Sequence, residues 1–292
     1  MSVDFCGLAL PHPVINGSGT FDAIAAAKAF GPEAYERFPF AAYVSKTITL
    51  KPRAGNPPPR LWETPAGLIN SIGLPNKGLE GYLAEDVPEL AKLPVALITN
   101  VMGSTAEEFS LLVEACDACP AVAAIELNVS CPNVKTGLDI GADPRQLEEV
   151  VRVLRPLTAK PLIVKLTPNT ADVASCAQAA QEGGADAVSL INTLRAMALA
   201  PPLPGRRRGP WLGGGTGGLS GPAIRAVALA QVAAVAARVA IPVVGMGGVQ
   251  GAAHARDLFD VGASRVAVGT ETFRDPAAGS RIADELSQSA AL

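Results

Sequence analysis

Polar residues follow most of the apolar runs in this sequence of 292 residues. A polar group left unpaired at the end of a buried strand costs ~1–3 kcal/mol, so a repeated pattern of such residues indicates a shared ligand. Asparagine offers both donors and acceptors, and lysine adds positive charge. The run ends concerned are Ser18, Lys46, Asn100, Asn128, Lys165, Asn192, Gly247 and Thr270. They predict a ring of hydrogen-bonding groups around a polar ligand.

Glycine-rich turns follow the last two runs. Gly245-Met246-Gly247-Gly248 comes after the seventh run and Gly269-Thr270 after the eighth, while Ser220-Gly221-Pro222 precedes a predicted helix. Glycine lets backbone N–H groups approach phosphate oxygens, and a helix N-terminus adds a favourable dipole. Each motif alone could be an ordinary turn. The three together favour a phosphorylated cofactor.

Cys131 is the candidate for a reactive group. It lies in Asn128-Val129-Ser130-Cys131-Pro132-Asn133, just beyond the fourth run. A reactive thiolate needs partial exposure and positive charge nearby, which Lys46 and Lys165 could provide. A lone cysteine is more often an inert small hydrophobe, so both interpretations stay open from the residues alone.

The sequence gives little support to other catalytic groups. Cys116 and Cys119 have the spacing of a metal-binding pair, but no second pair or nearby histidine completes a zinc or iron–sulfur ligand set. We therefore expect no metal. His12 and His254 lie outside the motif segments, which argues against a Ser-His-Asp arrangement.

Alternating strand-like and helix-like segments must position these residues. Most of the strand-like runs are nearly continuous in apolar residues, as in parallel strands that are buried on both faces. The runs are Val14–Ser18, Tyr43–Lys46, Val95–Asn100, Ala124–Asn128, Leu162–Lys165, Ala187–Asn192, Pro242–Gly245 and Arg265–Gly269. The helical segments are Thr105–Ala118, Pro144–Leu157, Thr170–Gly183, Pro222–Val239 and Gln250–Val261. Eight such repeats predict a (β/α)₈ barrel with its site at the carboxyl ends of the strands, although a doubly wound sheet remains open.

Two connections are too long to be simple crossovers. Residues 48–94 contain Trp62 and a proline run, and residues 194–221 contain Trp211, three consecutive arginines at 206–208 and the glycine-rich segment 213–218. Long loops in compact domains are usually functional or mobile, so we expect insertions at the carboxyl face of the barrel. Either tryptophan could belong to a lid or to simple packing. No linker or repeat is evident, which predicts one domain over residues 1–292.

Composition excludes several classes of protein. With 49% hydrophobic and 17% charged residues and a net charge of −3, the chain lacks the basic field that nucleic acid or anionic lipid requires. No apolar stretch reaches the ~18 residues of a membrane span, and five scattered cysteines do not suggest a disulfide framework. A cytoplasmic enzyme is expected.

The ordered set of motifs resembles the dihydroorotate dehydrogenase family. They are Asn70-Ser71-Ile72-Gly73-Leu74, residues 128–133, Val164-Lys165-Leu166-Thr167-Pro168-Asn169, Ile191-Asn192-Thr193, Gly217-Gly218-Leu219-Ser220-Gly221-Pro222 and Gly245-Met246-Gly247-Gly248-Val249. The cysteine at position 131 and Val134-Lys135 are similar to class 1B, the catalytic subunit of a two-subunit enzyme. Two departures are Asn16-Gly17-Ser18-Gly19, where the family more usually has alanine before the serine, and the 194–215 insert.

The resemblance implies an FMN-dependent oxidation of (S)-dihydroorotate to orotate in pyrimidine biosynthesis. Cys131 would remove the C5 proton, and FMN N5 would take the C6 hydride. FMN would be held by Ser18, Lys46, Thr47, Asn100, Asn128, Lys165, Ile191, Gly221, Gly247, Gly248, Gly269 and Thr270. The substrate would be held by Lys46, Asn70, Ser71, Ile72, Gly73, Leu74, Asn128, Asn133, Asn192 and Thr193.

The class resemblance also implies a partner. Electrons would reach NAD through a subunit carrying FAD and a 2Fe–2S cluster, in an assembly with a homodimer core or in a heterotetramer. Four alternatives stay open: a class 1A enzyme that reduces fumarate, a dihydropyrimidine dehydrogenase-like enzyme, a Schiff-base aldolase that uses Lys165 or Lys46, and a flavin-binding subunit without activity.

Overall fold

The computed structural model describes residues 3–129, 140–202, 204 and 207–289. Cys131 and Asn133, two residues predicted to belong to the site, lie outside these ranges.

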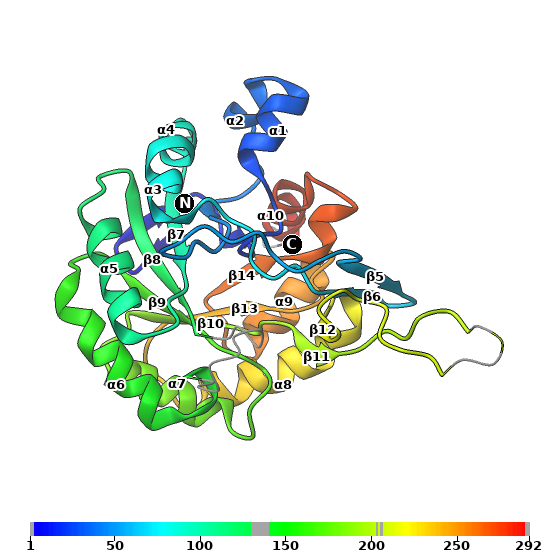
Figure 1. Ribbon diagram of the computed structural model, residues 1–292. Helices are drawn as coiled ribbons and strands as arrows, with labels where there is room; N and C mark the ends of the chain where they lie inside the picture. Colours follow the sequence, from blue (N-terminus) through cyan, green and yellow to red (C-terminus); the bar gives the residue numbers. More distant parts are fainter. Residues whose placement is uncertain (1–2, 130–139, 203, 205–206, 290–292) are drawn as a thin grey trace.

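An eight-stranded sheet forms the centre of the molecule, and every pairing between its strands is parallel (Figure 1). Its order is β3-β14-β13-β10-β9-β8-β7-β4. The strands are β3 (Val14–Asn16), β4 (Ala42–Val44), β7 (Ala96–Val101), β8 (Val122–Asn128), β9 (Leu162–Lys165), β10 (Ala187–Leu190), β13 (Val243–Met246) and β14 (Arg265–Val268). The eight predicted runs coincide with these strands to within two residues at each end.

Asn16 closes this sheet into a barrel. The edge strands β3 and β4 share no hydrogen-bonded ladder. Instead, the Asn16 side chain donates through Nδ2 to the Val44 carbonyl and accepts from the Val44 N–H through Oδ1, both at 2.8 Å. The N–H of Ala41 adds a bond of 3.0 Å to the carbonyl of Val14. The Asn16 side chain thus makes the two hydrogen bonds that a peptide group of a neighbouring strand would make. The predicted (β/α)₈ barrel is confirmed, and the alternative of a doubly wound sheet is excluded.

We expect Asn16→Ala to lower the free energy of unfolding by about 2–4 kcal/mol, because two buried backbone groups of Val44 lose their partners. Urea unfolding followed by circular dichroism measures the change. Asn16→Asp is the matched comparison: an ionised aspartate keeps the acceptor but has no donor for the Val44 carbonyl, whereas a protonated one regains an O–H donor, so its loss relative to wild type at the same pH should be smaller at low pH. Wild-type stability in Asn16→Ala would contradict the closing role.

Helices pack around the outside of the barrel (Figure 1). Those that follow the predicted segments are α5 (Ala106–Asp117), α6 (Pro144–Leu154), α7 (Val173–Glu182), α8 (Arg225–Ala236) and α9 (Ala252–Asp260). Thr105 and Asp143 cap α5 and α6 with their side chains. Further elements are α1 (Ala23–Phe30), α2 (Glu33–Glu36), α3 (Gly78–Gly81), a π-helical turn (Tyr82–Asp86), α4 (Val87–Leu90) and α10 (Ala278–Ser289). No helix in the described ranges is long and apolar enough to cross a membrane.

The inside of the barrel changes from apolar to polar toward its carboxyl end. A hairpin of β1 (Val3–Phe5) and β2 (Leu8–Leu10) contributes Phe5 and Leu10 to an apolar cluster that includes Ile98 and Ala124. Side chains alternate along a strand, so Asn100 and Glu126, two positions further on, also face the interior. The same reasoning places Lys165 beyond Ile163 and Ser189 beyond Ala187, two more residues of that cluster.

A second sheet, order β11-β12-β6-β5, arises from the two long connections. Its antiparallel strands are β5 (Leu61–Thr64), β6 (Gly67–Asn70), β11 (Leu194–Ala196) and β12 (Gly217–Ser220). Trp62 and Trp211 meet edge to face at 5.6 Å beside Ile69, Ala198 and Leu212, so both tryptophans pack within this insertion. The insertions at the carboxyl face are therefore partly ordered as a sheet, which sequence reasoning did not predict.

Candidate active site

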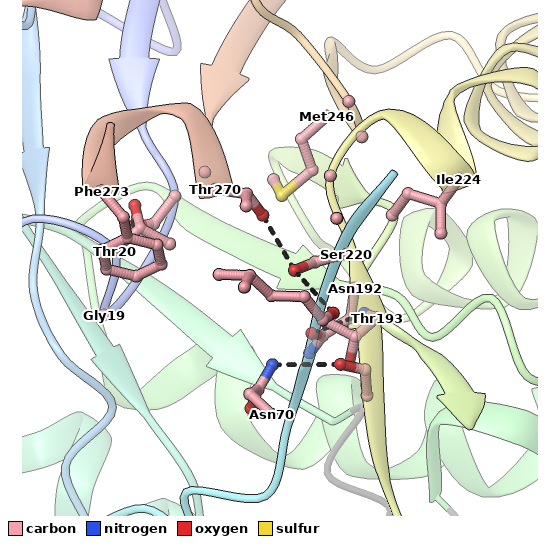
Figure 2. A pocket seen from close by; sticks show the side chains of 18 of the residues that line it. Gly19, Thr20, Asn70, Asn192, Thr193, Ser220, Ile224, Met246, Thr270 and Phe273 are labelled. Atoms are coloured by element: carbon pink, nitrogen blue, oxygen red, sulfur yellow. Dashed lines mark hydrogen bonds between the residues drawn. The ribbon is translucent and has the colours of Figure 1, made fainter. Parts of the chain in front are cut away.

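A cavity of about 830 Å³ opens where the carboxyl ends of the barrel strands meet the second sheet. This volume lies within the ~300–1,000 Å³ that is usual for cofactor and small-molecule sites. Figure 2 shows Asn70, Asn192 and Thr193 near one another, with Thr20 and Phe273 at another part of the wall. The position agrees with the predicted location of the site.

The cavity brings together most of the predicted site residues. Those in its lining are Ser18, Lys46, Thr47, Asn70, Ile72, Gly73, Leu74, Asn128, Lys165, Ile191, Asn192, Thr193, Gly221, Gly247, Gly248, Gly269 and Thr270. Asn100 and Ser71 are fully buried next to the cavity and do not line it. The roles assigned to individual residues remain predictions, including those of Cys131 and Asn133.

Lys46 lies across the turn that follows β3. A Cβ added to Gly19, which has φ +72°, would come within 2.9 Å of the Lys46 Nζ and Cδ atoms. Glycine at this position therefore gives the lysine room to lie over the backbone. Beside it, the Ser18 hydroxyl donates to the Ser45 carbonyl at 2.7 Å, and Asn128 Nδ2 donates to the Thr47 hydroxyl at 3.1 Å. These bonds hold the polar residues of one wall in fixed positions.

Lys165 supplies a buried positive charge. Its side chain ends strand β9 and only 6% of the residue is exposed, yet it forms no ion pair with another described residue. Burying an ammonium group without a counter-charge is costly. The arrangement therefore suits a ligand that brings negative charge or strong acceptors to this wall.

The glycine-rich turns form the opposite end of the cavity. Gly221, Gly247 and Gly248 have φ of +88°, +139° and +70°, which side chains rarely adopt. A Cβ on Gly247 would also lie 2.6 Å from the Ala228 Cβ in α8, so the turn packs directly on that helix. Nearby, the Thr270 hydroxyl donates to Ser220 Oγ at 2.8 Å (Figure 2). Backbone N–H groups and hydroxyls at the start of a helix suit a phosphate group.

The segment Asn70–Leu74 is held from behind by polar and glycine contacts. Asn56 Nδ2 donates to the Ser71 hydroxyl at 3.0 Å, and Asn76 Nδ2 donates to the Leu74 carbonyl at 2.9 Å. A Cβ on Gly214 would lie 2.3 Å from Ser71 Oγ, and one on Gly213 would lie 1.9 Å from the Pro57 carbonyl oxygen. The glycine-rich stretch thus allows close packing behind this wall of the cavity.

Sequence reasoning missed part of the rim. The β5–β6 hairpin contributes Glu63, Thr64, Pro65, Ala66 and Gly67, and other lining residues include Thr20, Ile224, Gln250, Phe273 and Arg274. The hairpin had a signal, because Pro65-Ala66 separates two short strand-like runs. Phe273 and Arg274 sit in a turn after β14 with no distinctive spacing, so nothing local marked them.

Neither histidine lines the cavity. His12 Nδ1 accepts from the Val14 N–H and His254 Nδ1 accepts from the Gln250 N–H, both at 3.3 Å. Burial lowers the pKa of each imidazole, so both act as neutral acceptors within the fold. Burial likewise raises the pKa of Cys116 to about 12, which leaves that thiol unreactive. In the described parts of the chain, no group of three or more histidine, cysteine, aspartate or glutamate side chains could hold a metal ion.

Comparison with known proteins agrees with this geometry. The family model described as dihydroorotate dehydrogenase matches residues 1–289. A protein of Pelobacter propionicus is 46% identical over 287 residues, covering 97% of this chain and 91% of its own length, and one of Citrifermentans bemidjiense is 44% identical over 292 residues, covering 99% and 92%. Both are named dihydroorotate dehydrogenase B (NAD(+)), catalytic subunit.

A solved structure supports the fold. The dihydroorotate dehydrogenase of Eimeria tenella, crystallised with ferulenol, superposes with a TM-score of 0.78 at 22% identity, covering 99% of this chain and 85% of its own. The family match over almost the whole length and the identity to the bacterial relatives confirm the resemblance that the motifs indicate. The chain belongs to the dihydroorotate dehydrogenase family.

Proposed function

We propose that this protein oxidises (S)-dihydroorotate to orotate in pyrimidine biosynthesis in the cytoplasm, as the catalytic subunit of a class 1B enzyme with FMN as its cofactor. The proposal rests on one observation: in a member of this family, a single cavity joins a buried lysine that has no ion-pair partner among the described residues, several amide side chains and a glycine-rich end suited to an anion. An orotate-forming reaction also fits an NAD-linked relative.

The residues present fit FMN. Gly221, Gly247, Gly248, Gly269 and Thr270 would hold the phosphate at the glycine-rich end of the cavity, close to where α8 begins. Polar residues of the other walls would hold the ring: Ser18, Lys46, Thr47, Asn100, Asn128, Lys165 and Ile191. A bound flavin supplies the acceptor for the hydride that leaves C6 of the substrate.

Dihydroorotate would lie against the ring, between the asparagines and the segment Asn70–Leu74. Lys46, Asn70, Ser71, Ile72, Gly73, Leu74, Asn128, Asn133, Asn192 and Thr193 would hold it. Amide side chains suit the alternating N–H and C=O groups of a dihydropyrimidine ring, and the lysine suits its carboxylate. Cys131 would take the C5 proton, and the positive charge of Lys46 and Lys165 would favour its thiolate.

The electrons would leave through a partner subunit. Relatives are named as catalytic subunits of an NAD(+)-linked enzyme. We propose a partner that carries FAD and a 2Fe–2S cluster, in a homodimer-based or heterotetrameric assembly. Purified chain alone should then reduce NAD far more slowly than the reconstituted complex.

Anaerobic addition of dihydroorotate tests the cofactor and the substrate together. We expect the purified protein to be yellow, with absorption near ~450 nm, and to bleach within seconds to minutes as the flavin is reduced. Dihydrouracil is the control and should leave the spectrum unchanged. A colourless protein that cannot be reconstituted with FMN, or bleaching by dihydrouracil alone, would contradict the proposal.

Gly213→Ala should weaken dihydroorotate binding while FMN remains bound. The added methyl would collide with the Pro57 carbonyl oxygen at 1.9 Å and displace the chain next to Asn56, whose side chain holds Ser71 of the segment Asn70–Leu74. An overpacking cost of about 1–3 kcal/mol corresponds to roughly fivefold in KM at the lower end. Gly209→Ala in the same connection is the control, because nothing lies within 4 Å of the added Cβ. An unchanged KM in Gly213→Ala would show that this packing does not shape the substrate wall.

A further inference from the structure

Three half-buried side chains link the glycine-rich turns to one another, and the proposed reaction gives them no role. Each stands shortly after a different turn: Arg225 at the start of α8, Gln250 beyond the turn after β13, and Glu271 beyond the turn after β14. Arg225 Nη2 donates to Gln250 Oε1 at 3.1 Å, and Gln250 Nε2 donates to Glu271 Oε2 at 3.1 Å. These three side chains form the Arg225 network.

The network also holds the backbone of the turn after β13. Arg225 Nε donates to the Gly248 carbonyl oxygen at 3.2 Å. A Cβ added to Gly248 would lie 2.9 Å from the Gly221 carbonyl oxygen and 3.0 Å from Arg225 Cβ, so this turn packs directly against the start of α8. In a trans peptide the C=O and N–H groups point in opposite directions. Because the Gly248 carbonyl is held toward Arg225, the Val249 N–H points away from it.

Backbone N–H groups of these turns lack acceptors in the described parts of the chain. The N–H groups of Gly248, Val249 and Thr270 donate to no described residue, and all three residues line the cavity. The next N–H along the chain, that of Gln250, donates to His254 Nδ1 at 3.3 Å. Successive N–H groups without a protein acceptor suit the oxygen atoms of an anion. The Arg225 network therefore adjoins the part of the cavity wall that offers these donors.

The carboxylate of the network is kept occupied by the protein. Glu271 lines the cavity, where a free carboxylate would repel an anion. While its Oε2 accepts from Gln250, its Oε1 lies 4.0 Å from Arg281 Nη2. Arg281 Nη1 also donates to the Gln250 carbonyl at 3.2 Å, so α10 supports the network from the other side. Glu271 thus anchors Gln250, and Gln250 in turn holds the Arg225 guanidinium.

We propose that Arg225, supported by Gln250 and Glu271, is a positioning residue that holds the turn after β13 as a preformed cradle for the phosphate group of the cofactor. The inference rests on the proposed function, because it requires a phosphorylated flavin at this end of the cavity. Arg225 itself does not line the cavity and acts through the Gly248 carbonyl and Gln250. Holding the turn in place avoids ordering it at the moment of binding.

A comparison of FMN with riboflavin tests this role. Riboflavin has the same ring system without the phosphate, so the ratio of the two dissociation constants isolates the contribution of the phosphate. Both constants are measured by flavin fluorescence on protein stripped of its cofactor. We expect the wild type to prefer FMN, and Arg225→Met to weaken FMN binding roughly tenfold while changing riboflavin binding less than about twofold.

A swapped pair separates the hydrogen bonds of the network from its charge. Gln250→Glu alone faces Glu271 with a second carboxylate and should weaken FMN binding by about tenfold or more. Gln250→Glu combined with Glu271→Gln restores a donor–acceptor pair between the two positions, keeps an acceptor for Arg225 and carries the same total charge as the wild type. This double variant should recover FMN binding to within about threefold of the wild type.

Arg256→Met is the matched control. Arg256, in α9, donates through Nη2 to the Glu285 carbonyl at 3.2 Å and does not line the cavity. Its loss should lower stability and leave the ratio of FMN to riboflavin binding unchanged. Equal weakening of both flavins in Arg225→Met, no recovery in the swapped pair, or a wild type that binds riboflavin as tightly as FMN would overturn the inference. A wild-type protein that binds neither flavin would instead contradict the proposed function.

Discussion

Replacing Cys131 by alanine should lower kcat for dihydroorotate oxidation by about 10²- to 10⁴-fold while FMN stays bound, because a positioned base contributes that much to proton transfer. The flavin should still be reduced by dithionite, which shows that the cofactor remains competent. Stopped-flow measurement of flavin reduction by dihydroorotate isolates the step in which the base acts. The binding of orotate should be nearly unchanged, since the thiol is assigned to the proton and not to affinity.

The pH dependence of flavin reduction separates a catalytic role of Cys131 from a structural one. Only the thiolate removes a proton, so the reduction rate should rise with pH and level off above the pKa of Cys131. A free cysteine titrates near ~8.5, so the inflection should fall within the range of pH over which flavin reduction can be followed. In Cys131→Ser, the rate should keep rising to higher pH, because a hydroxyl ionises less readily.

Cys119→Ala is the control for loss of a thiol. Cys119 is half-buried at the end of α5 and does not line the cavity. Its substitution should leave the reduction rate and the pH profile unchanged. A wild-type rate in Cys131→Ala, or a flat profile from about pH 5 to 9 where reduction is rate-limiting, would remove Cys131 as the base.

Much of the barrel could be predicted from the sequence because its strands are buried on both faces. Runs such as Leu162–Lys165 contain little except apolar residues until the point where they reach the cavity, and the structure begins and ends that strand at the predicted residues. The polar side chain that ends most of these runs is therefore both a boundary and a functional signal. The same physics explains why the glycine turns after β13 and β14 were identified.

The second sheet could not be predicted, because its strands come from distant parts of the chain and because one of them contains residues that rarely form strands. Asn70 pairs with Gly218, 148 positions away in the chain. Strand β12 begins with two glycines, which usually weaken a strand. The structure gives the reason: a Cβ on Gly217 would lie 2.4 Å from the Asn70 carbonyl oxygen, and one on Gly218 would lie 1.9 Å from Thr193 Oγ1. The glycine-rich segment 213–218 looks like low complexity in the sequence, but Gly217 and Gly218 are needed because the neighbouring residues lie too close for a side chain.

Two single residues escaped prediction for another reason. Asn16 precedes Ser18 and reads as a variation in a turn, yet its side chain closes the barrel. Glu126 stands alone as a charge within an apolar strand, and its partners Asn100 and Ser189 come from two other strands. Both act through partners that adjoin them only after the barrel has formed. Their type is visible in the sequence, but their contacts are not.

Lys165→Met should weaken FMN binding by roughly 10- to 150-fold, the equivalent of about 1.5–3 kcal/mol for a hydrogen bond to a charged group. The same change should leave the cofactor-free protein as stable as wild type or more stable, because it removes a buried ammonium that has no ion-pair partner among the described residues. Titration with FMN and urea unfolding of the stripped protein measure the two effects separately. Lys160→Met, before the opposite end of β9, is the matched control: Lys160 Nζ donates to the carbonyls of Cys116 and Cys119 at 2.8 and 2.6 Å, so its loss should reduce stability and spare FMN. Weaker FMN binding together with unchanged or higher stability in Lys165→Met would show that this charge serves ligand binding. Loss of both affinity and stability would instead show that Lys165 supports the fold.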